Sequence, residues 1–220
     1  MVNGIIGRKK GMTQVFLEDG TLVPVTVIDA GHCSVVQKKS PEKDGYTAVQ
    51  LGAFAGKEKR LGKPRSGHGK KHGGKLVRRI IEFRVPSLEG LESGQDIKVE
   101  EVFTVGDRVD VRGTSKGRGF AGTVKRHKFN VGPMTHGSMN HRAPGSIGQC
   151  ATPGRVFKGR KLPGHHGDRN VTVRNLQVVR IDAENHILLV RGAVPGAFNA
   201  EVLVRKTKKG VRVPKYQTGS

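Results

Sequence analysis

The chain has 220 residues, of which 40 are Lys or Arg and 18 are Asp or Glu, so its formal net charge at pH 7 is +22. Only 35% of the residues are hydrophobic and 5% aromatic, with no Trp, whereas ordinary globular domains are roughly 45–50% apolar. Part of the chain therefore lies outside any hydrophobic core. The charge favours a polyanionic partner, such as nucleic acid, an anionic membrane surface or a heparin-like glycan, over a small neutral substrate.

Targeting signals are not evident in the sequence. Residues 1–10 lack the continuous apolar stretch of about 7–15 residues found in a secretory signal, and no apolar run approaches the roughly 20 residues of a membrane-spanning helix. Cys33 and Cys150 lie far apart in segments of different character, which suits reduced thiols rather than a disulfide framework. We expect a soluble cytoplasmic protein with no membrane partner.

Short strands dominate the predicted secondary structure. Apolar and polar residues alternate over residues 15–27 around an Asp19-Gly20 turn, which predicts a β-hairpin. Further strands are predicted at residues 46–51, 79–85, 97–102, 108–112, 171–181, 187–190 and 201–204. No window sustains an apolar period of 3.6 residues, so helices should be few and short. The sequence predicts a mainly β fold, a small barrel or sandwich.

Charge divides the chain into regions. Residues 111–167 contain eleven Lys and Arg and no acidic residue, whereas residues 82–110 contain eight Asp and Glu. We expect a globular β domain formed by residues 1–112 and 170–204, and a basic, Gly-rich, largely irregular internal extension over residues 113–169. The extension buries too little apolar surface to order itself, and a polyanion would order it. Residues 56–79 are predicted to be a basic inserted loop, and residues 205–220 a basic C-terminal tail.

Candidate RNA-binding residues are the cations and histidines of these basic segments. Those of the extension are Lys116, Arg118, Lys125, Arg126, His127, Lys128, His136, His141, Arg142, Arg155, Lys158, Arg160 and Lys161. Those of the inserted loop are Lys57, Lys59, Arg60, Lys63, Arg65, Lys70 and Lys71. Because aromatic residues are scarce, binding should use phosphates, 2′-hydroxyls and RNA shape more than base stacking.

One glycine motif allows an alternative from another class. Residues 117–124 match the G-x-G-x-x-G-x-V pattern of a kinase phosphate-covering loop, which suggests a nucleotide-using phosphotransferase. The other kinase motifs are missing, and His141-Arg142-Ala143 has no carboxylate for a base or a metal. A third alternative is a general polyanion binder without one cognate site.

Metal and catalytic constellations are also incomplete. His68 and His72, like His165 and His166, lack cysteines or carboxylates at ligand spacing. We therefore expect no metal, no catalytic residues, no cofactor and no small-molecule substrate.

The longest motif carries a resemblance. Residues 113–127, Gly-Thr-Ser-Lys-Gly-Arg-Gly-Phe-Ala-Gly-Thr-Val-Lys-Arg-His, closely resemble the bacterial form of the third protein of the large ribosomal subunit. Further segments follow that family's order: residues 7–13, 136–138, 141–148, 153–159, 175–176 and 192–196. Matching segments thus span most of the chain.

The resemblance implies a structural constituent of the large ribosomal subunit, not an enzyme. It implies a β-barrel similar to the second domain of translation elongation factors, direct binding to 23S ribosomal RNA, contacts with neighbouring ribosomal proteins, and an early role in subunit assembly. It also implies that the tip of the extension lies near the peptidyl transferase centre. Carried over to this sequence, the tip residues are Gly145, Ser146, Ile147, Gly148, Gln149, Cys150, Ala151 and Thr152.

Two positions depart from relatives. Some family members have a methylated glutamine two residues after the first glutamine of the tip, where this chain has Ala151, so we expect no such methylation. Relatives often have methionines in the region of residues 162–167, where this chain has His165 and His166, and RNA contact by these histidines stays open.

Overall fold

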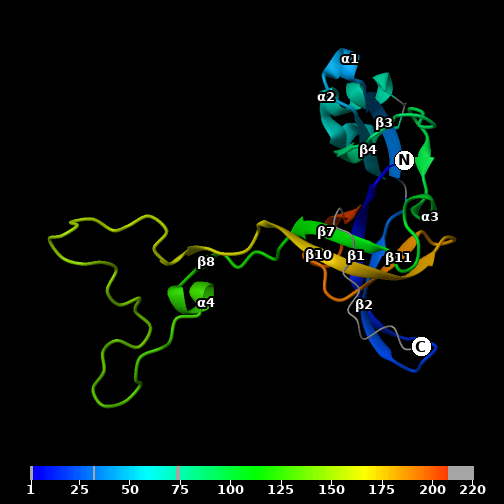
Figure 1. Cartoon of the computed structure of the whole chain (residues 1–220). Helices are drawn as coiled ribbons and strands as arrows, with labels where there is room; N and C mark the ends of the chain where they lie inside the picture. Colours follow the sequence, from blue (N-terminus) through cyan, green and yellow to red (C-terminus); the bar gives the residue numbers. More distant parts are fainter. Residues whose placement is uncertain (1, 32, 73–74, 208–220) are drawn as a thin grey trace. The chain divides into compact units, whose positions relative to one another are not determined.

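The computed structural model describes residues 2–31, 33–72 and 75–207, and it confirms the predicted mainly β fold (Figure 1). The chain divides into two compact units. We call Met1–Thr114 with Asn170–Ser220 the globular unit, and Ser115–Arg169 the basic unit. The predicted C-terminal tail, residues 205–220, lies outside the described residues from residue 208 onward.

Six antiparallel strands of the globular unit form a closed barrel. Their order is β1 (Gly4–Phe16), β12 (Glu201–Lys206), β7 (Arg108–Thr114), β10 (Asn170–Asp182), β11 (Ile187–Arg191) and β2 (Leu22–Asp29), and β2 pairs with β1 to close the ring. The predicted hairpin of residues 15–27 is confirmed by the β1–β2 pair, in which Val15 lies opposite Val23. Closure leaves none of these strands as a free sheet edge over the paired residues.

A second sheet and three short helices complete the globular unit. The sheet has the order β5 (Val77–Arg84), β4 (Ala48–Ala55), β3 (Cys33–Lys39) and β6 (Asp96–Ile97). The helices are α1 (Pro41–Asp44), α2 (Glu58–Lys71) and α3 (Val99–Val102). Figure 1 shows α1 and α2 beside the second sheet.

Barrel and second sheet share one hydrophobic core. Its largest fully buried side chains include Phe83, Phe103, Ile5 and Leu188. The fit is close at Gly4, where a Cβ atom would lie 2.5 Å from the carbonyl oxygen of Val204, so only glycine fits there. The globular unit is therefore held together by its own apolar contacts.

Three secondary-structure predictions need correction. Residues 97–102 were predicted to be a strand, but after Ile97 the chain forms α3, and the Lys98 backbone N–H donates to Glu101 Oε2 at 3.4 Å. The inserted loop of residues 56–79 contains α2, kinked at Gly62, where φ is 73°. Ser66 and Lys70 both donate to the Glu58 carboxylate, and these bonds brace the helical turns. Strand β3 was not predicted.

The basic unit has little regular structure. Strand β8 (Phe120–Ala121) pairs with β9 (Gly164–His165), and α4 (Thr123–His127) follows β8. Backbone bonds extend this pairing, because Arg118 N–H donates to the His166 carbonyl and Ser115 N–H to the Arg169 carbonyl, at 2.9 and 2.8 Å. Between α4 and β9 the chain forms irregular loops (Figure 1).

Candidate nucleic-acid interface

The basic unit carries a strongly uncompensated positive charge. It contains eleven Lys and Arg, and Asp168 is its one acidic residue. Across the part of the chain that the structure describes, no ion pair involves a residue of this unit. Seven of the predicted cations are exposed, and their side chains make no internal hydrogen bond that the structure describes: Lys116, Arg118, Lys125, Lys128, Arg142, Lys158 and Lys161. An external polyanion would relieve their mutual repulsion.

The β8–β9 pair gathers cations from both ends of the unit around His166. Burial lowers the pKa of His166 below its ordinary value, and the nearby charges of Arg118, Arg126 and Arg169 lower it further. The fold thus places a neutral imidazole among guanidinium groups that lie up to 51 residues apart in the sequence.

Two predicted site residues act inside the unit instead. Arg126 Nη1 donates to the Leu162 carbonyl at 2.6 Å, and the Nε2 atom of His127 lies 3.0 Å from the same oxygen. The Arg126 guanidinium also packs against Gly164, where a Cβ atom would lie 2.6 Å from Nη1. Both side chains are half-buried, so we assign them to positioning of the segment after α4.

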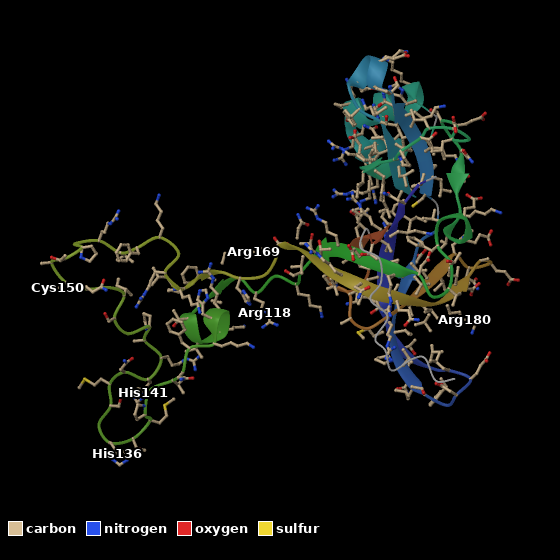
Figure 2. All side chains as sticks on the ribbon, viewed as in Figure 1. Arg118, His136, His141, Cys150, Arg169 and Arg180 are labelled. Carbon is tan, nitrogen blue, oxygen red and sulfur yellow. The ribbon has the colours of Figure 1, made fainter. Side chains whose placement is uncertain are left out.

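His136 and His141 lie on one irregular loop (Figure 2). The Gly132 N–H donates to the His141 carbonyl at 2.9 Å and closes this loop, while His136 is exposed at a φ of 60°. The Nδ1 atom of His141 is buried and has no hydrogen-bond partner among the described residues.

The predicted tip, residues 145–152, is exposed at every position and contains no cation. Ser146 anchors its first turn: the hydroxyl donates to the Gly148 carbonyl at 2.9 Å, and the Ser146 carbonyl accepts from Arg160 Nη2 at 2.6 Å. Beyond the tip, the Arg155 guanidinium lies 5.5 Å from the centroid of the Phe157 ring. Arg155 and Arg160 therefore shape the loop that presents the tip.

The other predicted cations lie on or beside α2 in the globular unit. Lys70 pairs with Glu58, and Arg65 Nη1 donates to the Arg78 carbonyl at 3.3 Å. Exposed side chains that make no such described contact are Lys57, Lys59, Arg60, Lys63 and Lys71. The helix presents these cations on a fixed backbone, where the sequence had suggested an irregular loop.

The remaining chemistry-bearing groups form no site. Among residues 2–31, 33–72 and 75–207, no group of three or more His, Cys, Asp or Glu side chains is arranged to hold a metal ion. Over the same residues, no helix is long and apolar enough to cross a membrane. Cys33 and Cys150 are free thiols, one buried and one exposed.

Arg169 is a residue of this surface that sequence reasoning missed. It follows Asp168, which seemed to end the acid-free segment, yet its carbonyl pairs with Ser115 N–H and its charge acts on His166. The pairing of residues 115–121 with residues 164–169 places Arg169 on this surface. The glycine-rich composition of these segments gives no strand pattern from which that pairing could be predicted.

Comparison with known proteins finds relatives that match nearly the whole chain. A family model described as "Ribosomal protein L3" matches residues 68–187. The chain is 54% identical over 206 residues to the large ribosomal subunit protein uL3 of Heliobacterium modesticaldum, covering 94% of this chain and 97% of that protein. It is 51% identical over 210 residues to the protein of the same name from Carboxydothermus hydrogenoformans, covering 96% and 100%. For the Acetivibrio thermocellus protein the identity is 55% over 205 residues, covering 93% and 97%.

Proposed function

The chain belongs to the ribosomal protein L3 family, and from this premise we propose that it binds 23S ribosomal RNA directly, chiefly through the basic unit. The family consists of structural proteins of the large ribosomal subunit that serve translation in the cytoplasm, not of enzymes.

One observation carries the proposal. The basic unit exposes ten cations without a carboxylate partner on a backbone that has almost no core of its own; only Ala121 and Thr123 in it are buried. A protein surface built this way is stabilised when phosphates neutralise it, since each contact releases counterions from the nucleic acid. Glycine-rich loops let the backbone approach the RNA closely.

The proposed domain organisation follows from the same charge map. Residues 1–112 and 170–204 form a globular domain similar to the barrel of translation elongation factors, and it sits on the subunit surface. Residues 113–169 form an extension that enters the RNA. Its tip, residues 145–152, reaches toward the peptidyl transferase centre, where a loop without cations supports RNA geometry rather than adding affinity. The chain also joins the subunit early in assembly and contacts neighbouring ribosomal proteins.

Salt dependence of RNA binding tests this proposal. Replacing Lys116, Arg118 and Lys125 by Ala removes three exposed cations, and we expect the slope of log K against log salt to fall by about 2, at roughly 0.7 per contact. The control variant replaces Lys38, Lys43 and Lys98, exposed cations of the globular unit, with the same change in net charge. Equal slopes for the two variants would remove the basic unit from the interface.

Changes at the tip have a different expected result. Replacing Gln149 or Cys150 should alter peptidyl transfer or antibiotic response in assembled ribosomes and leave the affinity for RNA nearly unchanged, because both side chains are uncharged and exposed. Wild-type translation and drug sensitivity in both variants would contradict the placement of the tip.

The second candidate is general binding to any polyanion, and the net charge of +22 favours it. Footprinting on deproteinised 23S RNA, with competitor RNA and raised salt, separates the two. A discrete protected site that survives competition supports the ribosomal proposal, whereas protection that spreads or disappears supports the general binder.

A further inference from the structure

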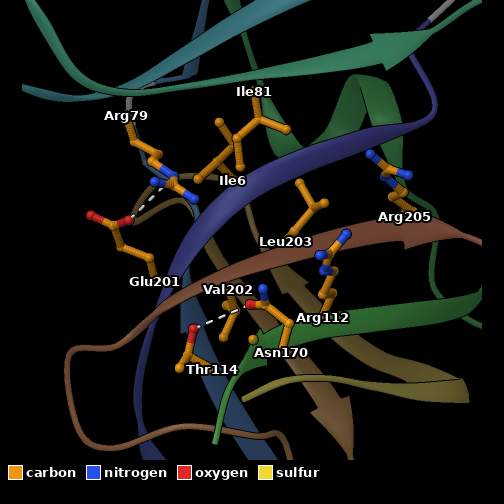
Figure 3. Close-up of a pocket in the computed structure, with 11 residues that line it drawn as sticks. Ile6, Arg79, Ile81, Arg112, Thr114, Asn170, Glu201, Val202, Leu203 and Arg205 are labelled. Carbon is orange, nitrogen blue, oxygen red and sulfur yellow. Dashed lines mark hydrogen bonds and ion pairs between the residues drawn. The ribbon is translucent and has the colours of Figure 1, made fainter. Parts of the chain in front are cut away.

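A cleft on the globular unit is lined by arginines from four strands (Figure 3). One part of it, about 340 Å³ in volume, is drawn in Figure 3, and an adjoining part of about 860 Å³ shares Arg112, Leu203 and Arg205 with it. Its five arginines are Arg79 and Arg84 of β5, Arg112 of β7, Arg174 of β10 and Arg205 of β12. None of them was among the RNA-binding residues predicted from the sequence.

The register of the barrel explains why these side chains meet. On β7, Val109 and Val111 are buried in the core, so the alternating residue Arg112 points outward. Arg112 lies opposite Leu203 on β12 and opposite Thr172 on β10. Residues two positions further along those strands, Arg205 and Arg174, therefore share the outer face with Arg112.

The carboxylates in the cleft already have partners. Glu201 pairs with Arg79 at 3.6 Å. Glu82 accepts hydrogen bonds from the Tyr46 hydroxyl at 2.9 Å and from Gln50 Nε2 at 2.7 Å, and Asp110 Oδ1 accepts from the Asn175 N–H at 2.9 Å.

Four arginines of the cleft nevertheless form no ion pair, because Glu82 and Asp110 hydrogen-bond to uncharged donors instead. Within the described parts of the chain, no carboxylate forms an ion pair with Arg84, Arg112, Arg174 or Arg205. The four side chains are exposed, so a ligand can reach them.

The cleft is also organised before any ligand arrives. The Arg205 guanidinium lies 5.1 Å from the centroid of the Phe83 ring, and Nη2 donates to the Glu82 carbonyl at 3.4 Å. Partial burial of its guanidinium group, followed by the positive charge of Arg112, lowers the pKa of Arg205. The Arg84 guanidinium lies 5.7 Å from the centroid of the Tyr46 ring. The two guanidinium groups lie over ring faces, and cations outnumber carboxylates in the lining of the cleft, which favours an anionic ligand.

The arrangement of the arginines narrows the class of anion. They come from four strands and line both parts of the cleft rather than surrounding one point. An extended anion with successive phosphates meets more of them than a single ion does, and an RNA backbone is such an anion.

We propose that this arginine cleft is a second RNA-binding site, which holds a length of ribosomal RNA backbone through its phosphates, separately from the basic unit. This inference rests on the proposed function. The aromatic rings of Tyr46 and Phe83 are taken up by arginines, so the cleft offers no free platform for base stacking and reads the backbone rather than the base sequence.

The test uses the full chain and deproteinised 23S ribosomal RNA. In R112Q/R174Q, we expect the slope of log K against log salt to fall by about 1.4–1.8, at roughly 0.7–0.9 per phosphate contact, with an unchanged midpoint of thermal unfolding. R112K/R174K should keep most of the slope because the charges remain. The matched control is R180Q/R191Q, which removes two exposed arginines of the barrel that do not line the cleft.

The outcomes separate this inference from the proposed function. A wild-type slope in R112Q/R174Q, together with a reduced slope in the Lys116, Arg118 and Lys125 variant, overturns the cleft and leaves the basic unit in place. Wild-type slopes in both overturn both proposals. If R112Q/R174Q unfolds at a lower temperature, R174Q alone carries the test, with half the expected change.

A further arm distinguishes RNA from free phosphate. Inorganic phosphate, added at constant ionic strength, should not reduce the difference in RNA affinity between wild type and R112Q/R174Q. If the two proteins bind RNA with equal salt slopes and wild type alone binds millimolar phosphate, the cleft is a site for the free anion, and its assignment to RNA is wrong.

Discussion

The globular unit and the basic unit are stabilised in opposite ways. The globular unit buries Phe83, Phe103 and Leu188 in a core shared by two sheets, and several of its carboxylates pair with lysines. The basic unit has 55 residues, which include one carboxylate and form a single pair of two-residue strands. The globular unit can fold on its own apolar contacts. The basic unit depends on negative charge from a partner, which the chain itself does not supply.

Excision of the basic unit tests this contrast most strongly. Thr114 and Asn170 lie opposite each other on β7 and β10, so a two-residue Asn-Gly turn can replace residues 115–169 and join the strands as a hairpin. We expect the excised protein to unfold within a few degrees of the full chain. Its salt slope for RNA should fall by roughly 6, because the excision removes eight exposed cations that make no internal side-chain contact, at about 0.7 each.

A lower unfolding temperature by tens of degrees would show that the basic unit supports the barrel, against this view. An unchanged salt slope would show that the globular unit alone accounts for RNA affinity. The wild-type protein is the comparison for both the unfolding temperature and the salt slope.

The two cysteines give the second largest expected difference. Burial raises the pKa of Cys33 to about 12, and its Sγ atom donates to the Ile6 carbonyl at 3.1 Å, whereas Cys150 is exposed in the tip. At pH 8 the thiolate fraction of Cys33 is on the order of 10³-fold below that of an ordinary thiol near pKa 8.5. Mass spectrometry after brief iodoacetamide treatment should find Cys150 modified and Cys33 intact.

Urea supplies the control for this labelling, because unfolding should make both thiols reactive. Comparable rates at Cys33 and Cys150 in the native protein would mean that the core around Cys33 opens freely.

Sequence reasoning succeeded where the pattern was local. Alternation around Asp19-Gly20 identified the β1–β2 hairpin, and the run of β-branched residues after residue 170 identified β10 and β11. It failed at β3 and α3, where neighbours decide the conformation: the central position of β3 between β4 and β6, and the Glu101 carboxylate that caps α3.

The candidate sites show the same limit. A count of cations without acids was enough to find the basic unit's surface, but it did not show that Arg126 and His127 bind the Leu162 carbonyl. The arginine cleft was not predictable from spacing, because Arg112 and Arg174 meet through strand register in the barrel and Arg84 joins them from the second sheet. Single arginines on strands look like ordinary surface residues until the register is known.

Truncation of one apolar residue in each unit should give a smaller contrast. Leu188 is fully buried, so Leu188→Ala should reduce the free energy of unfolding by about 2–5 kcal/mol. Ile147, in the tip, is 42% exposed, and Ile147→Ala should change it by less than about 0.5 kcal/mol. Urea denaturation of both variants measures the two values. A loss above about 1 kcal/mol for Ile147→Ala would contradict the absence of a core in the basic unit.

The smallest effect concerns the proton on His166. In the free protein, burial and neighbouring cations lower the pKa of His166, so the fold favours the neutral ring. The stability that this contributes is present above the ordinary histidine pKa of about 6.5 and is lost as pH falls from there through the lowered pKa of the folded state. RNA phosphates beside the ring would raise that pKa again. Binding then takes up a fraction of a proton, and affinity rises as pH falls from about 7.5 to 5.5.

Calorimetric titration in buffers of different ionisation enthalpy counts this proton. His166→Gln should reduce the uptake on RNA binding, whereas His165→Gln, a change at the exposed neighbour, serves as the control. If His166→Gln and wild type take up the same number of protons, no phosphate lies near His166 in the complex, and the β8–β9 pair serves to join the ends of the basic unit rather than to contact RNA. A reduced uptake would instead place the RNA backbone beside Arg118 and Arg169, whose charges act on the same ring.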